Sequence, residues 1–156
     1  MQRIIKLFVA AVVVVVLLVL MGRFWAARSA PAASTLGVVG GKLPPCPDSP
    51  NCVSSQTADA EHQVDGIPFV GDAAAAQARM RQVLAEMPRT RIVVDEPGYL
   101  RAEFRTLIFD YVDDGEFYFD TAAGVIQVRS ASRLGYSDLG ANRARIETIR
   151  TAFVSQ

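Results

Sequence analysis

The sequence is poor in the residues that bind metals and nucleic acids. It has one histidine, His62, and two cysteines, Cys46 and Cys52, which are too few for the four Cys and His ligands of an ordinary zinc site. From residue 43 onward it has no lysine, and 16 acids there outnumber 11 arginines. A nucleic-acid binder needs a basic surplus. We therefore expect no nucleic-acid partner, no metal and no cofactor.

Charge is also missing from a long stretch near the N-terminus. Residues 7–22 are uncharged and mostly aliphatic, and Arg23, Phe24 and Trp25 follow them. Extended to residue 27, the stretch is about 31 Å long as a helix, which matches a hydrocarbon core of about 30 Å. We expect residues 1–27 to be a transmembrane anchor. A signal peptide cleaved near residues 30–32 is the alternative, although its apolar region would be long.

Two signals place the rest of the chain outside the cytoplasm. The amino terminus, Arg3 and Lys6 precede the apolar run and two arginines follow it, so the positive-inside rule favours a cytoplasmic N-terminus. Cys46 and Cys52 enclose a short turn-rich loop that a disulfide could close, and disulfides persist in oxidising compartments. Reduced thiols are the alternative. We expect a single-pass inner-membrane protein with its C-terminal domain in the periplasm.

Composition divides the remainder into a tether and one domain. Residues 28–45 are rich in Ala, Pro, Gly and Ser without an apolar period, which predicts a flexible tether. Residues 46–156 form the extracytoplasmic α+β domain, and residues 46–71 within it are loop-like. Apolar residues at helical spacing predict one helix from the N-cap Asp72 to Met87 and another over residues 141–154.

Between these helices, alternating apolar and polar residues predict four strands. They cover residues 90–95, 99–112, 116–121 and 125–133, with turns at residues 96–98, 113–115 and 122–124. Short turns of this kind join antiparallel neighbours. The expected fold class is α+β: a two-layer sandwich with a four-stranded antiparallel meander and two helices on one face, preceded by one N-terminal transmembrane helix.

Alternation also assigns a face to each strand residue. Arginines mixed with aromatics on the outer face suit an anionic ligand, a lipid headgroup or a partner protein, whereas arginines paired with Glu103 and Asp120 on a solvated face are the alternative. We expect Tyr111, Tyr118 and Arg129 to align across three strands. The residues expected to face the helices are Leu100, Ala102, Phe104, Ile108, Phe117, Phe119, Ile126 and Val128. The residues expected on the outer face are Arg101, Glu103, Arg105, Phe109, Tyr111, Tyr118, Asp120, Arg129 and Arg133.

The start of the last helix is a second candidate site. Arg143 and Arg145 lie in its first turn, where positive charge opposes the helix dipole. Asp138 could offset this charge, or a bound phosphate or carboxylate could.

Few features of the sequence indicate catalysis. Ser54 and Ser55 are available as nucleophiles, but the sequence has no Gly-x-Ser-x-Gly elbow, and Cys52 is a better partner for Cys46 than His62 is. The acids at 113 and 114 are expected to be solvated turn residues. The sequence therefore favours a non-enzymatic role.

Three stretches of the sequence are distinctive: residues 46–56 (CPDSPNCVSSQ), 129–133 (RSASR) and 135–143 (GYSDLGANR). Together with residues 104–114, they resemble the family catalogued as domain of unknown function 1499, over about residues 43–153. The resemblance implies a bacterial or plastid protein, often behind an N-terminal hydrophobic segment, and it implies no activity. It draws attention to Ser130 and Ser132, whose inward-facing hydroxyls need partners. The 46–56 loop could supply them, forming either a ligand site or a purely structural network.

These observations predict a membrane-anchored, non-catalytic binding or accessory domain, with the membrane and a larger membrane protein complex as partners. An anion- or lipid-headgroup-binding domain and a serine-dependent hydrolase built on Ser54 or Ser55 are the alternatives. A small anion is the expected ligand, and Cys46 and Cys52 are expected to form a disulfide. The predicted ligand-binding residues are Arg129, Ser130, Ser132, Arg133, Ser137, Asp138, Asn142 and Arg143.

Overall fold

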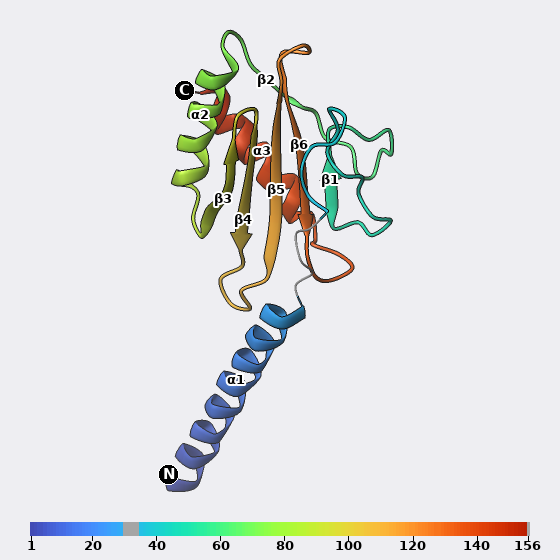
Figure 1. Ribbon diagram of the computed structural model, residues 1–156. Helices are drawn as coiled ribbons and strands as arrows, with labels where there is room; N and C mark the ends of the chain where they lie inside the picture. The colour runs from blue at the N-terminus through green and yellow to red at the C-terminus, as the bar shows by residue number, and fades with distance from the viewer. Residues whose placement is uncertain (30–34, 156) are drawn as a thin grey trace.

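A long N-terminal helix and an α+β domain make up the computed structural model, which describes residues 1–29 and 35–155 (Figure 1). The sheet of the domain is antiparallel, has the order β1-β6-β5-β4-β3, and carries β2 as a second partner of β6. The helices are α1 (Gln2–Ser29), α2 (Ala73–Glu86) and α3 (Ala141–Val154). The strands are β1 (Cys52–Ser54), β2 (Ile67–Pro68), β3 (Thr90–Glu96), β4 (Tyr99–Arg105), β5 (Val112–Asp120) and β6 (Val125–Ser132).

Both helices of the domain pack on one face of the sheet, as predicted. Met80 of α2 and Ile146 of α3 are fully buried and belong to one apolar core with Leu100 and Phe117 of the sheet. Asp72 caps α2, because its side chain accepts a hydrogen bond from the amide of Ala75 (3.2 Å). The α+β class is confirmed.

The prediction of four strands was wrong, since the sheet has six within residues 1–29 and 35–155. The two additional strands, β1 and β2, lie in the segment expected to be loop-like, and both pair with β6. They have only three and two residues, so no alternation can develop along them. The pairing of β1 brings the Cys46–Cys52 loop against β6 and the start of α3.

The predicted turn at residues 113–115 was also wrong, because these residues lie inside β5. The chain turns instead over residues 106–111. Asp113 and Asp114 are buried and bound to arginines from other elements. Gly115 fits a close contact, since a Cβ at this position would lie 2.6 Å from the ring of Phe104. Tertiary contacts thus override a local sequence pattern that is typical of a turn.

This shift changes the assignment of several side chains. Ile108, which was expected in the core, is 56% exposed in the 106–111 loop, whereas the other seven predicted inward residues are buried. Phe109 and Tyr111 also belong to that loop rather than to the outer face. Tyr118 pairs with Tyr99 and Gln127, and Arg129 pairs with Glu116. The predicted alignment of Tyr111, Tyr118 and Arg129 is therefore wrong.

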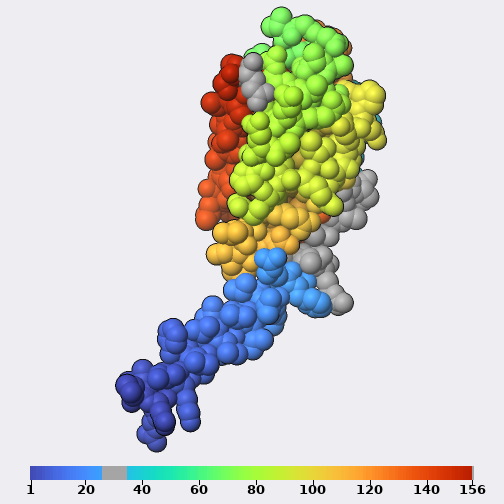
Figure 2. All heavy atoms as spheres, turned by 90° about the vertical axis from the view of Figure 1, so that its left-hand side faces the viewer, coloured from blue at the N-terminus to red at the C-terminus, as the bar shows by residue number. Residues whose placement is uncertain are grey.

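The N-terminal helix extends away from the domain (Figures 1 and 2). Its segment Gln2–Trp25 is long and apolar enough to cross a membrane, a test that a signal sequence also passes, and none of its most apolar window is buried by the domain. Residues 30–34 of the predicted tether lie outside the described residues. Its later part contacts the domain, since the amide of Gly37 donates to Glu116 and Leu43 is buried.

The predicted disulfide between Cys46 and Cys52 is confirmed, with Cα atoms 5.6 Å apart. The bridge closes a loop that leads directly into β1. It therefore fixes the direction from which the chain enters the edge of the sheet.

Candidate functional site: a pocket beside the N-terminal helix

The outer face of the sheet carries a network of ion pairs. Arg133 donates to both carboxylate oxygens of Asp114 (2.6 and 2.8 Å) and to Glu103 (2.7 Å). Arg91 and Arg105 also donate to Glu103, each at 3.2 Å. Burial raises the pKa of Glu103, but the hydrogen bonds from these arginines outweigh burial and hold the pKa below its usual value. The network therefore keeps the Glu103 carboxylate charged, and it occupies both carboxylates with arginine partners.

Arg129 lies on the same face in a separate pair. Its Nη1 donates to Glu116, which is fully buried, at 3.1 Å, while its buried Nε has no hydrogen-bond partner among the described residues. Cross-strand pairing, one of the two interpretations of this face, is present for Glu103. Asp120 instead accepts from the amides of Ala122 and Ala123.

The inner face holds a second polar cluster, centred on Asn142 of α3. The Asn142 side-chain oxygen accepts from Ser130 (2.6 Å), and its amide donates to Ser132 (3.1 Å) and to the carbonyl of Asn51 (3.0 Å). Arg145 donates to the same Asn142 oxygen and to Asp113, both at 2.5 Å. The 46–56 loop therefore does reach the inward-facing serines: its backbone pairs with theirs directly, and Asn142 connects their hydroxyls to the carbonyl of Asn51.

The remaining predicted site residues lie at the start of α3 and point in different directions. Arg143 donates to the carbonyl oxygens of Gln63 (2.6 Å) and Glu61 (2.7 Å). Asp138 accepts from the amides of Gly140 (3.0 Å) and Asn142 (2.7 Å), so it offsets the helix dipole by capping it. The predicted residues thus fall into three groups, and their arginines do not share one pocket. The groups are Arg129 and Arg133 outside, Ser130, Ser132 and Asn142 inside, and Ser137, Asp138 and Arg143 at the helix start.

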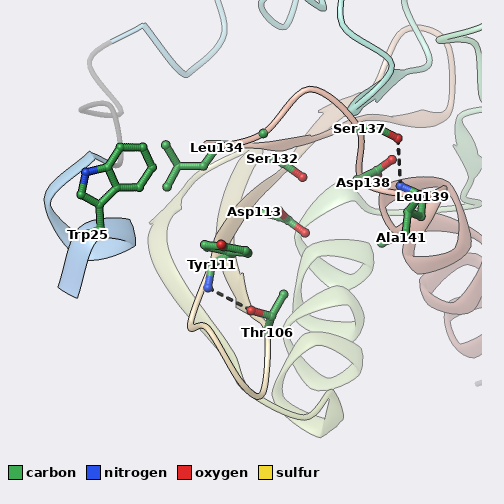
Figure 3. Close-up of a pocket in the computed structure, with 11 residues that line it drawn as sticks. Trp25, Thr106, Tyr111, Asp113, Ser132, Leu134, Ser137, Asp138, Leu139 and Ala141 are labelled. Carbon is green, nitrogen blue, oxygen red and sulfur yellow. Dashed lines mark hydrogen bonds between the residues drawn. The ribbon is translucent and has the colours of Figure 1, made fainter. Parts of the chain in front are cut away.

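A pocket of about 360 Å³, here called the anchor-side pocket, opens where the domain meets α1 (Figure 3). Residues 106–111 and 133–140, the loops after β4 and β6, form most of its wall. Three predicted ligand residues line it, namely Ser132, Ser137 and Asp138. The full lining is Trp25, Thr106, Tyr111, Asp113, Ser132, Leu134, Gly135, Ser137, Asp138, Leu139 and Ala141.

The lining combines apolar side chains with hydroxyl groups. In Figure 3, Trp25 and Leu134 form one side of the pocket, and Ser137 and Asp138 lie on the other. The hydroxyl of Thr106 accepts from the amide of Tyr111 (2.9 Å), so its own proton is free to be donated to a ligand. The pocket can therefore hold an amphiphilic molecule, with an apolar part near Trp25 and polar groups opposite.

Sequence reasoning missed much of this lining because residues 106–111 were assigned to a strand. Leu107, Ile108 and Phe109 are consecutive apolar residues, which breaks the alternation that a half-buried strand needs. That break is the signal that could have shown the loop. Trp25 was assigned only to the membrane interface.

A second pocket, of about 250 Å³, lies beside the disulfide loop and brings together Ser54, His62 and Asp59. The geometry is not that of a catalytic triad. His62 Nδ1 binds the carbonyl of Cys52 (2.8 Å), and its Nε2 is 3.7 Å from Asp59. Neither ring nitrogen is hydrogen-bonded to the Ser54 hydroxyl in the described structure, and that hydroxyl instead accepts from the amide of Gln56 (3.2 Å).

The fold and the pocket define a small α+β domain with an apolar N-terminal helix and a polar-apolar pocket at their junction. The chain belongs to the family described as "Protein of unknown function (DUF1499)", whose model matches residues 42–153. No curated protein and no solved structure matches the chain. The match covers the whole sheet, α2 and most of α3, but not Trp25, so the family match does not include the α1 side of the pocket.

Proposed function

We propose that this chain is a membrane-anchored, non-catalytic binding domain that faces the periplasm from the inner membrane and binds its ligand in the anchor-side pocket. The length and apolar composition of α1 support the anchor, and the Cys46–Cys52 disulfide is typical of an oxidising compartment. The position of the pocket is the observation that supports this proposal most strongly. It lies between the domain and the end of the proposed anchor, and Trp25 of α1 lines it.

The polar groups around the pocket support a non-catalytic role. Asp113 is bound to Arg145 and Asp138 caps α3, so both carboxylates of the lining already have strong partners. A general acid or base must be within hydrogen-bond reach of the proton that it transfers, and these two carboxylates are engaged with Arg145 and with the start of α3 instead.

The lining favours a neutral or amine-bearing polar group over a small anion. None of the eleven lining residues is basic, and Asp138 is an acid that binds backbone amides and not an arginine, so an anion would meet charge of its own sign there. Hydroxyl groups of Thr106, Tyr111 and Ser137 can bind hydroxyls or an amine, while Trp25 and Leu134 offer apolar surface. The ligand we propose is an amphiphile with such a headgroup.

Filling the pocket tests this assignment. Ala141→Phe adds a large side chain at an exposed residue that lines the pocket, and Ala144→Phe is a matched control on the same helix, exposed but outside the lining. The full-length proteins are purified from membranes in mild detergent, and bound lipids are identified by native mass spectrometry. We expect wild type and Ala144→Phe to retain the same amphiphile, and Ala141→Phe to lose roughly tenfold or more of it.

Equal occupancy in Ala141→Phe, or no bound amphiphile in the wild type, would contradict the assignment. Thermal melting of both variants checks that each is folded. A protein that co-migrates in a fixed ratio with all three forms would show instead that the domain is an accessory subunit of a larger membrane complex.

A further inference from the structure

Exposed apolar side chains gather at the end of the domain that meets α1. Nine large hydrophobic residues beyond α1 are exposed in the described structure, and six of them lie in the loops at 106–111 and 133–140. We call four of these the loop tips: Leu107 (71% exposed), Ile108 (56%), Tyr136 (75%) and Leu139 (96%). Scattered apolar residues need no explanation, but a concentration at one end indicates a surface that is covered in the working protein.

The structure fixes the 106–111 loop at a definite level along α1. The side chain of Arg23 donates to the carbonyl of Ile108 (3.1 Å) and lies 3.8 Å from the carboxylate of Asp110. The ring of Phe109 packs against Gly22, where an added Cβ would be 3.3 Å from the ring. The loop therefore lies beside residues 22–23 of the helix. Figure 2 shows the domain meeting the N-terminal helix at this end.

That level coincides with the surface of a bilayer that α1 would span. Twenty residues counted back from Trp25 give about 30 Å of helix, which is about the thickness of the hydrocarbon core. Lys6 and Arg23 then lie at its two edges, where long basic side chains can reach the headgroups. Phe24 and Trp25 are residue types enriched at the interface. A loop held at residues 22–23 is thus at the depth of the headgroups.

The chemistry of this end suits a lipid surface. Leucine, isoleucine and tyrosine partition into the interfacial layer. Asp110, beside the tips Leu107 and Ile108, is neutralised by Arg105 (3.1 Å) and Arg23. Asp138, beside the tip Leu139, accepts from the amides of Gly140 and Asn142 at the start of α3, where the helix dipole favours a negative charge. Arg89 is exposed beside Arg105, whose carbonyl it binds, so a basic group is available for lipid phosphates. Apolar tips with a basic neighbour match the boundary between acyl chains and headgroups.

We propose that the loop tips insert into the interfacial layer of the membrane that holds α1, so that the anchor-side pocket opens among lipid headgroups. This inference rests on the proposed function, because it needs α1 to be an anchor. It adds that the domain lies on the bilayer at a fixed height and does not swing freely on its tether. It also identifies the amphiphile as a lipid of the adjoining leaflet.

The depth of single labelled residues in the bilayer of lipid vesicles tests whether the loop tips insert. Leu107→Cys, Leu139→Cys and Val70→Cys are made separately in the full-length chain, with the native disulfide left intact, and the new thiol is labelled with an environment-sensitive fluorophore. Val70 is the matched control, since it is 99% exposed and follows Phe69, whose amide binds Gly124 at the opposite end of the sheet. The vesicles contain phosphatidylethanolamine and phosphatidylglycerol, with or without a lipid carrying a shallow nitroxide quencher.

We expect labels at 107 and 139 to be blue-shifted and quenched several-fold more than the label at 70. All three substituted residues are exposed, so each variant should melt like the wild type. If the three labels are quenched equally and weakly in protein that resists carbonate extraction, the proposed insertion is wrong. The proposal of an anchored binding domain would then still stand. A blue shift at 107 or 139 without lipid quenching would also overturn the insertion, because the tips would then contact protein. Extraction of the chain by carbonate would overturn the proposed anchor itself.

Discussion

Glu116 is a fully buried acid in the middle of β5, and three groups donate hydrogen bonds to its carboxylate. Arg129 donates to one carboxylate oxygen (3.1 Å), while Tyr99 and the amide of Gly37 donate to the other, both at 2.8 Å. A buried carboxylate without such partners would be strongly destabilising. Through these hydrogen bonds, Glu116 connects strands β4 and β6 with Gly37, which precedes the domain in the sequence.

Tyr99 makes the stability of this network depend on pH. Burial and the neighbouring charge of Glu116 raise the pKa of the Tyr99 hydroxyl far above its usual value of about 10. The folded state therefore keeps the proton where the unfolded chain would release it. The stabilisation is fully present below about pH 10 and is lost as the pH rises beyond it. We expect the free energy of unfolding, measured with urea between pH 7 and 11, to fall steeply above pH 10.

Tyr99→Phe should remove most of this slope. It should also cost about 1 kcal/mol at pH 7, because Glu116 loses a hydrogen bond. Tyr136→Phe, at an exposed tyrosine, serves as the matched control and should follow the wild type at every pH. Parallel curves for wild type and Tyr99→Phe above pH 10 would show that Tyr99 does not cause the alkaline loss.

Asn142 connects three elements that are far apart in the sequence. It lies near the start of α3, binds Ser130 and Ser132 of β6, and binds the carbonyl of Asn51 in the disulfide loop. Asn142→Ala would leave several of these buried groups without a partner, at about 1–3 kcal/mol for each group that water cannot reach. We expect a loss of about 2–4 kcal/mol in the free energy of unfolding, measured by denaturant titration.

Thr148→Ala is the control, since it changes an exposed residue of the same helix whose hydroxyl binds only a helix carbonyl (2.9 Å). It should change stability by less than about 0.5 kcal/mol. Equal effects of the two variants would show that Asn142 does not clamp the loop to the sheet. The same conclusion would follow if Ser130 and Ser132 formed hydrogen bonds with other groups in the Asn142→Ala protein and its free energy of unfolding did not fall.

The elements that the sequence predicted correctly are those specified by local signals. Asp72 marks the start of α2 because an N-cap acts within three residues. The helix over residues 141–154 follows from a stripe of three apolar residues, all buried. The turn at Gly98 needs a positive φ, which glycine adopts readily. In each case the cause and the consequence lie within a few residues of each other.

The elements that were missed depend on distant partners. Asp113, Asp114 and Gly115 resemble a turn locally, but Arg145, 32 residues from Asp113, and Arg133, 19 residues from Asp114, bind their carboxylates within β5. The candidate site was predicted only in part for the same reason, because its residues are distant in the sequence. Ser132, Ser137 and Asp138 were predicted from one continuous stretch, whereas Trp25 and the 106–111 loop reach the same pocket only through the tertiary fold.

A chain of alternating charges links the N-terminal helix to the sheet. It runs from Arg23 to Asp110 (3.8 Å), then to Arg105 (3.1 Å), Glu103 (3.2 Å) and finally Arg133 (2.7 Å). The first pairs are partly exposed, so each contributes at most about 1 kcal/mol. Packing of Phe109 on Gly22 adds a close contact at the same junction. These contacts together hold Trp25 at the mouth of the anchor-side pocket.

The membrane topology of the full-length chain in a bacterial cell is the most direct test of a membrane-anchored domain facing the periplasm. A reporter enzyme that works only outside the cytoplasm is fused after Gln156, membranes are washed with carbonate, and the N-terminus of the retained protein is sequenced. We expect an active reporter in the washed membranes and a chain that still carries residues 1–27. An active cytoplasmic-only reporter in the same position, or a soluble product that begins near residue 33, would contradict it.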